Sequence, residues 1–67
     1  MAVAKIIEVY ASSEKSVEDA VRSGLKKTAE SVKNIRGAWI KETKVQVDGE
    51  GNITEWRVAM KITFVVE

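Results

Sequence analysis

Residues 16–34, SVEDAVRSGLKKTAESVKN, form the stretch of this 67-residue chain that decides its fold. Apolar and small residues recur there every three or four positions, the spacing that collects them on one side of an α-helix. They are Val17, Ala20, Val21, Gly24, Leu25, Thr28, Ala29 and Val32. Ser16 is suited to cap this helix, because its hydroxyl can accept hydrogen bonds from the first turn, and Asp19 could complete a shortened capping box. Asn34 can end it. The stretch therefore predicts one amphipathic helix that must pack against the rest of the chain.

Three flanking segments are rich in β-branched and aromatic residues and predict strands. They are residues 3–10 (VAKIIEVY), 38–48 (AWIKETKVQVD) and 53–66 (ITEWRVAMKITFVV). Residues 48–52 contain two glycines and predict the turn of a hairpin between the last two strands. The order β-α-β-β predicts an α+β fold, in which a three-stranded antiparallel sheet with strand order 2-3-1 packs on one helix.

Alternation along the last strand predicts which face of the sheet meets the helix. One side carries only apolar residues, namely Trp56, Val58, Met60, Ile62, Phe64 and Val66. We expect Val21 and Leu25 of the helix to pack against Ile62 and Phe64. The odd-numbered residues of the strand, Arg57 among them, then point away from the helix. In the first strand both sides are apolar, with Ile7 and Val9 on one side and Ala4, Ile6 and Tyr10 on the other.

Length and composition predict a single domain over residues 1–67 that is stabilised by self-association. A chain this short buries only about 60% of its surface by itself. The sequence has no Cys and no His, which excludes disulfides and the common zinc sites. Hydrophobic residues nevertheless make up 45% of the chain, more than one helix face and one sheet face can hide. The last two strands also outreach the helix, and their exposed ends would form a ribbon that invites pairing with another subunit.

Charge and residue inventory exclude several classes of function. The net charge is +1 with both signs interspersed, so no basic patch predicts nucleic-acid binding. No signal peptide or membrane span is recognisable, which predicts a cytoplasmic location without membrane partners. Without His or Cys there is no ready general base or nucleophile. The serines near residue 16 are explained by turn and cap chemistry. We therefore predict that the protein is not an enzyme.

Residues 5–42 (KIIEVYASSEKSVEDAVRSGLKKTAESVKNIRGAWIKE) and 48–64 (DGEGNITEWRVAMKITF) together resemble the dodecins. The resemblance covers essentially the whole chain. It implies a β-α-β-β subunit that assembles as a hollow homododecamer. It also implies a non-enzymatic role in binding and storing a flavin, which can be FMN, FAD or riboflavin. Such an assembly would bury the second sheet face and the long hairpin between subunits.

The family's flavin site uses a Trp early in the second strand, which stacks on the ring, and a Gln early in the third. In this sequence Arg57 occupies the Gln position. The Trp position falls on Gly37 or Ala38, depending on where a one-residue insertion is placed, and Trp39 follows closely. The resemblance therefore assigns Trp39, Arg57, Gly37 and Ala38 to the candidate ligand site, and the displaced Trp predicts weak flavin binding.

Trp39 and Arg57 have two interpretations. As a binding site, the indole would offer a stacking platform and the guanidinium planar donors for a carbonyl edge or a phosphate. As an interface, the two would form a cation–π contact between subunits. Trp39 should share a surface with Arg57 if the second strand alternates without a bulge, with Ala38 and Ile40 turned inward.

A second branch of the family lacks the flavin Trp and Gln and is described as calcium-binding. Residues 34–38 and Arg57 look more like that branch, although no calcium ligands can be assigned by position. The Asp48, Glu50 and Asn52 oxygens have a spacing that partly resembles a calcium loop, but position 59 holds Ala where a full loop needs Glu. A solvated turn is the preferred interpretation there. The alternatives to flavin binding are thus a member that binds calcium or another cation, or a purely structural assembly.

Overall fold

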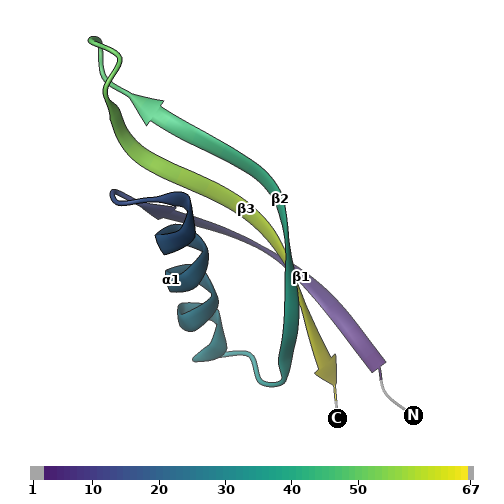
Figure 1. The fold of residues 1–67 in the computed structure, drawn as a ribbon. Helices are drawn as coiled ribbons and strands as arrows, with labels where there is room; N and C mark the ends of the chain where they lie inside the picture. The colour runs from purple at the N-terminus through teal and green to yellow at the C-terminus, as the bar shows by residue number, and fades with distance from the viewer. Residues whose placement is uncertain (1–2, 67) are drawn as a thin grey trace.

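The computed structural model describes residues 3–66. Its elements are β1 (Val3–Ser13), α1 (Val17–Ala29), β2 (Ile35–Val47) and β3 (Ile53–Val66), in that order (Figure 1). The strands form one antiparallel sheet in the order β1-β3-β2. The predicted β-α-β-β topology and sheet order are confirmed. The first strand is longer than predicted at its carboxyl end, and the second begins earlier.

Ser16 caps α1 as predicted, since the Asp19 backbone N–H donates to the Ser16 hydroxyl at 3.0 Å. The second half of the predicted capping box is wrong. The Asp19 carboxylate instead accepts from the Ser13 hydroxyl at 2.6 Å, and the oxygen of Ser13 accepts from the backbone N–H groups of Lys15 and Ser16. A serine at the end of β1 therefore ties the strand to the start of the helix.

The helix ends at Ala29, five residues before Asn34. The Ser31 and Val32 backbone N–H groups both donate to the Thr28 carbonyl, which tightens the chain into a turn after the last helical residue. Asn34 has a positive φ of 64°, and its carbonyl accepts from the Val65 N–H at 3.0 Å. Asn34 thus redirects the chain into the sheet rather than capping the helix. No helix within residues 3–66 is long and apolar enough to cross a membrane.

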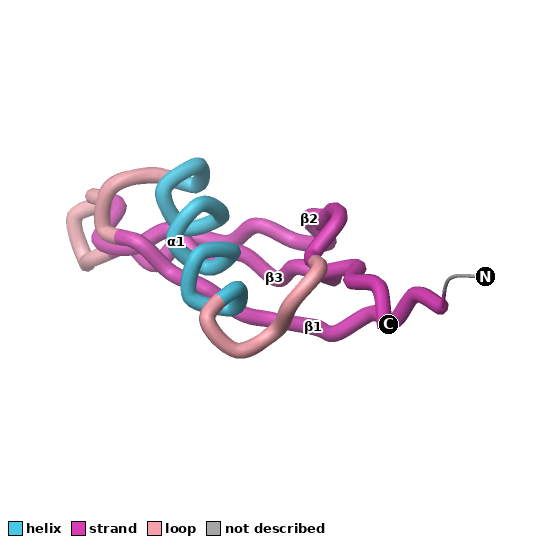
Figure 2. Tube along the Cα trace, turned by 90° about the horizontal axis from the view of Figure 1, so that it is seen from below, coloured by secondary structure: helices cyan, strands magenta, loops and turns pink. Residues whose placement is uncertain are grey.

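Figure 2 shows α1 lying over one side of β1 and β3, and the core lies between them. Met60 and Ile62 are fully buried, and Val58 and Ala20 are at most 2% exposed. Partly buried residues packed around them are Ile7, Val9, Ala11, Val17, Val21, Leu25 and Ile35. The predicted docking face and the roles of Ile62, Val21 and Leu25 are confirmed. Phe64 is only half-buried and lies outside this cluster. The side chains of β3 that are fully buried under α1 are Met60 and Ile62.

Gly24 sets the separation between helix and sheet. A Cβ atom at this position would lie 2.8 Å from Cβ of Ala11 and 2.9 Å from Cε of Met60, closer than atoms can pack. The absence of a side chain therefore lets α1 approach β1 and β3 closely.

The β2–β3 hairpin extends well beyond the helix, which gives the subunit an elongated shape of 54 × 19 × 13 Å (Figure 1). Its turn is the one predicted at residues 48–52. The Asp48 carboxylate accepts from the backbone N–H groups of Glu50 and Asn52, and Gly51 has the positive φ, 87°. These hydrogen bonds, first from Asn52 and then from Glu50, lower the pKa of Asp48.

Large apolar side chains remain exposed along the sheet. They are Val3, Ile6, Tyr10, Trp39, Ile40, Val45, Val47, Ile53 and Val66. Since α1 packs on β1 and β3, the apolar residues that β2 directs to the helix side, such as Ile40 at 45% and Val45 at 44% exposure, have no cover. One subunit therefore buries the apolar side chains under α1 but leaves these other large apolar side chains exposed.

Candidate functional site

The side of the sheet opposite α1, called the outer face below, holds most of the candidate residues. Residues paired across an antiparallel sheet point to the same side. Ile62 pairs with Ile7 and Ala38 on the helix side, whereas the next residue, Lys61, pairs with Glu8 and Trp39 on the outer face. Continuing in steps of two along β3, Ala59 and Arg57 also belong to the outer face.

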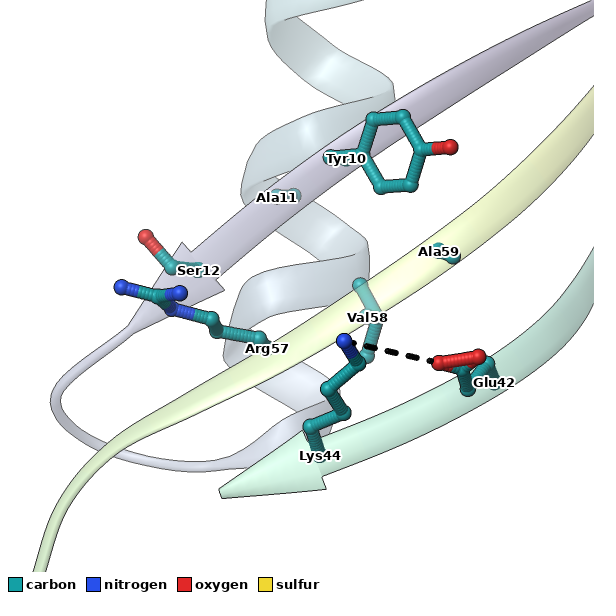
Figure 3. Close-up of a pocket in the computed structure, with 8 residues that line it drawn as sticks. All are labelled: Tyr10, Ala11, Ser12, Glu42, Lys44, Arg57, Val58 and Ala59. Atoms are coloured by element: carbon teal, nitrogen blue, oxygen red, sulfur yellow. Dashed lines mark ion pairs between the residues drawn. The ribbon is translucent and has the colours of Figure 1, made fainter. Parts of the chain in front are cut away.

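A shallow hollow of about 360 Å³ lies on the outer face, over the middle of the sheet. Its lining residues are Tyr10, Ala11 and Ser12 of β1, Arg57, Val58 and Ala59 of β3, and Glu42 and Lys44 of β2 (Figure 3). The floor is low because Ala59 contributes only a methyl group between the long side chains of Arg57 and Lys61. Figure 3 shows the Tyr10 ring and the Glu42–Lys44 pair on opposite sides of β3.

Two cations and one carboxylate line the hollow. The Nζ atom of Lys44 lies 3.8 Å from Oε1 of Glu42, and both side chains are more than half exposed. Arg57 pairs with Ser12 and Lys44 in the sheet register, and its Nε donates to Oε1 of Glu55 at 2.6 Å. Each cation therefore has a carboxylate beside it, Glu42 for Lys44 and Glu55 for Arg57.

Tyr10 is held in place by a short hydrogen-bond chain. Its hydroxyl donates to Oε2 of Glu8 at 3.1 Å, and the same oxygen lies 3.3 Å from Nζ of Lys41. The hydrogen bond from Tyr10, followed by that from Lys41, lowers the pKa of Glu8. The carboxylate in turn raises the pKa of Tyr10. The hydroxyl is thus engaged with Glu8, while Tyr10 as a residue is 75% exposed and its ring remains free to stack.

Of the predicted site residues on β2, the structure places Gly37 and Trp39 on the outer face and Ala38 on the helix side. Gly37 pairs with Thr63, Trp39 with Lys61, and Ala38 with Ile62. The strand does contain irregularities, one of them between Ile40 and Glu42. The other two lie between Ile35 and Gly37 and between Gln46 and Val47. The condition of a strand without a bulge is therefore wrong, but Trp39 pairs with Lys61 and so still lies on the outer face.

Trp39 and Arg57 share the outer face but do not touch. Their register partners on β3 are four residues apart, about 13 Å along the strand. The cation over the Trp39 ring is the Lys61 ammonium, 5.4 Å from the ring centroid. Within one subunit Arg57 pairs with Glu55, and a cation–π contact of Trp39 with Arg57 between subunits stays a prediction.

Of the predicted site residues only Arg57 lines the hollow, whereas Gly37, Ala38 and Trp39 do not. The other seven lining residues were not predicted, and Tyr10 is the aromatic one among them. Alternation in β1 already places it on the side opposite Ile7 and Val9, which is the side of Arg57. Its position beside the hollow depends on the register of Tyr10 with Ala59, which a single sequence does not reveal. Among residues 3–66 no group of three or more His, Cys, Asp or Glu side chains is placed to hold a metal.

Comparison with known proteins assigns the family. The family model described as Dodecin matches residues 3–67. The chain belongs to the dodecin family. A separate comparison with curated proteins found no match. The dodecin assignment therefore rests on the family model.

Solved dodecin structures share the fold at low sequence identity. An arginine-to-alanine mutant of the Thermus thermophilus dodecin is 22% identical, with a TM-score of 0.92 over 100% of this chain and 98% of that one. The dodecin from Streptomyces davaonensis is 23% identical, with a TM-score of 0.92 over 98% of this chain and 96% of that one. The calcium dodecin of Mycobacterium tuberculosis, described as calcium-chelating, is 29% identical, with a TM-score of 0.82 over 97% of this chain and 91% of that one.

Proposed function

We propose that this dodecin is a non-enzymatic binding and storage protein that forms a hollow homododecamer and binds a flavin or a related planar aromatic ligand weakly. The observation that carries the proposal is the outer face. Tyr10, which lines the hollow together with Arg57, is 75% exposed there, and Trp39, which lies farther along the same face beside Lys61, is 63% exposed. An exposed aromatic ring beside a shallow hollow suits a flat ligand.

Assembly is supported by the apolar surface that one subunit leaves open. Large exposed side chains lie on both sides of the sheet, among them Ile6 on the outer face and Ile40 on the helix side. Contiguous apolar surface of this kind marks protein–protein interfaces. Strands β1 and β2 are also sheet edges, whose free backbone groups favour pairing with another chain.

A non-catalytic role is supported by the residue inventory and the use of the serines. The sequence has neither His nor Cys. The hydroxyls of Ser13 and Ser16 are engaged at the start of α1, where they accept or donate structural hydrogen bonds. The outer face thus offers stacking and hydrogen-bonding groups rather than an activated nucleophile.

Riboflavin titration, followed by quenching of flavin fluorescence, tests the ligand part of the proposal. We expect weak binding to the wild-type protein and further weakening in Trp39→Ala and Tyr10→Ala. Gly37→Trp should strengthen binding, since a side chain there points to the outer face and a Cβ meets nothing within 4 Å. Gly49→Trp, an equally open position in the hairpin turn, is the matched control. Tight binding that survives both alanine substitutions would contradict the proposal.

Cation binding is the second candidate, and the similarity to the calcium-chelating Mycobacterium tuberculosis dodecin favours it. Within residues 3–66 of one chain no sufficient group of ligands converges, so a calcium site would need carboxylates from neighbouring subunits. Isothermal titration of the metal-free oligomer with calcium tests this candidate. Binding of calcium without riboflavin would favour it, and binding of neither would favour a purely structural assembly.

A further inference from the structure

The floor of the hollow is formed by a small side chain. Between Arg57 and Lys61, the outer face of β3 carries only the methyl group of Ala59, which is 9% exposed. The Tyr10 ring lies beside it on β1 (Figure 3). A planar aromatic ligand lying over Ala59 would meet Tyr10 at one side and the Arg57 side chain at one end.

Arg57 has hydrogen-bonding capacity left over. Within residues 3–66 its ion-pair partner is Glu55, which is bound through Nε. The two Nη groups form the other edge of the guanidinium, a planar pair of donors without any acceptor. Lys44 adds a second cation on the β2 side of the hollow, and its 3.8 Å contact with Glu42 is loose and exposed. Both groups can therefore turn donors toward a ligand.

We propose that the hollow selects planar aromatic ligands that carry a carboxylate in the plane of the ring, and that Arg57 is the residue that makes this choice. The inference rests on the proposed ligand binding at the outer face and names the class of ligand. Figure 3 shows the Arg57 guanidinium beside Ser12 at one end of the hollow. A ring over Ala59 whose coplanar carboxylate reaches this end would accept two parallel N–H···O bonds from the Nη groups of Arg57. A tetrahedral phosphate on the ring would leave that plane.

Neutral rings with an N–H on their edge fit less well. The edge of a carboxamide or an imide carries one C=O acceptor and one N–H donor. The guanidinium has only N–H donors, so the N–H of the ligand faces another donor and stays unpaired, and one of the two hydrogen bonds is lost. The same argument predicts that Arg57→Gln, whose amide both donates and accepts, removes the preference for the anion.

The test compares 2-naphthoate with 2-naphthamide. The two probes share the naphthalene ring, but the first carries a charged carboxylate where the second carries a neutral carboxamide. Equilibrium dialysis against the assembled protein measures both, with riboflavin as a third probe. We expect 2-naphthoate to bind about tenfold more tightly than 2-naphthamide. In Arg57→Gln the two should bind within about twofold of each other. Arg22→Gln removes the same charge from the exposed side of α1 and should keep the wild-type preference.

Three outcomes would overturn the inference. If riboflavin binds but the two naphthalenes bind equally, ligand binding stands and the selection by charge fails. A preference that persists in Arg57→Gln would show that another cation selects the ligand. If neither riboflavin nor either naphthalene binds, the proposed function of the outer face fails, and the selection with it.

Discussion

The helix side of the sheet and its outer face differ sharply in how much of their apolar surface the chain covers. On the helix side of β3, Val58, Met60 and Ile62 are at most 2% exposed. On the outer face of β1, Ile6 and Tyr10 are 63% and 75% exposed. Both sets alternate along the same paired strands, so strand propensity does not distinguish them. The difference arises because the chain has one helix, which covers β1 and β3 on one face and leaves most of β2 and the outer face open.

The two faces therefore have different roles. Side chains under α1 stabilise the subunit through burial, whereas those on the outer face are available to other subunits or a ligand. Substitutions on the helix side should therefore change the stability of the chain. Substitutions on the outer face should change assembly and binding while the subunit keeps its secondary structure.

The largest expected effect is that of Met60→Ala. Met60 is fully buried between α1 and the sheet, so truncation loses burial and leaves a cavity. We expect a loss of about 2–5 kcal/mol in the free energy of unfolding. Denaturant unfolding followed by circular dichroism measures it. Tyr10→Ala, also on the sheet but exposed, is the matched comparison and should keep the folded circular dichroism spectrum. Equal losses in both variants would contradict the division between the faces.

A smaller effect is expected at the glycines. Gly24→Ala places a methyl group 2.8 Å from Cβ of Ala11, so the helix must move away from the sheet. Overpacking of this kind costs about 1–3 kcal/mol. In Gly37→Ala the added methyl lies on the outer face and meets nothing within 4 Å, so the melting temperature should change little. A melting temperature for Gly24→Ala equal to that of the wild type would show that α1 is not packed as closely as described.

The fold could be predicted because several local signals agree. The helical period in residues 16–34, the alternation in residues 53–66 and the glycines at 49 and 51 each indicated one element, and the structure has all three. The sequence placed the end of the helix too late, because Val32 continues the apolar period. In the structure α1 ends at Ala29, and the Val32 N–H donates to the Thr28 carbonyl within the turn that follows. Such turns depend on tertiary pairing, here of Asn34 with Val65, which periodicity does not record.

The candidate site was predicted only in part. Alternation correctly placed Arg57 and Trp39 on one face, but not their separation along the sheet. Trp39 lies beside Lys61, and Tyr10 lines the hollow beside Ala59. Strand register determines both positions. Register depends on bulges such as that between Ile40 and Glu42, where one extra residue shifts the pairing. The sequence contains no distinct signal for that shift.

The most direct test of the contrast between the faces is the mass of the purified protein in solution. Size-exclusion chromatography with multi-angle light scattering, at micromolar concentration, measures it without a ligand. If the outer face and the hairpin are completed by other subunits, the protein should elute as a single species with the mass of twelve chains. A stable species of 7.4 kDa, the mass of one chain, would contradict it.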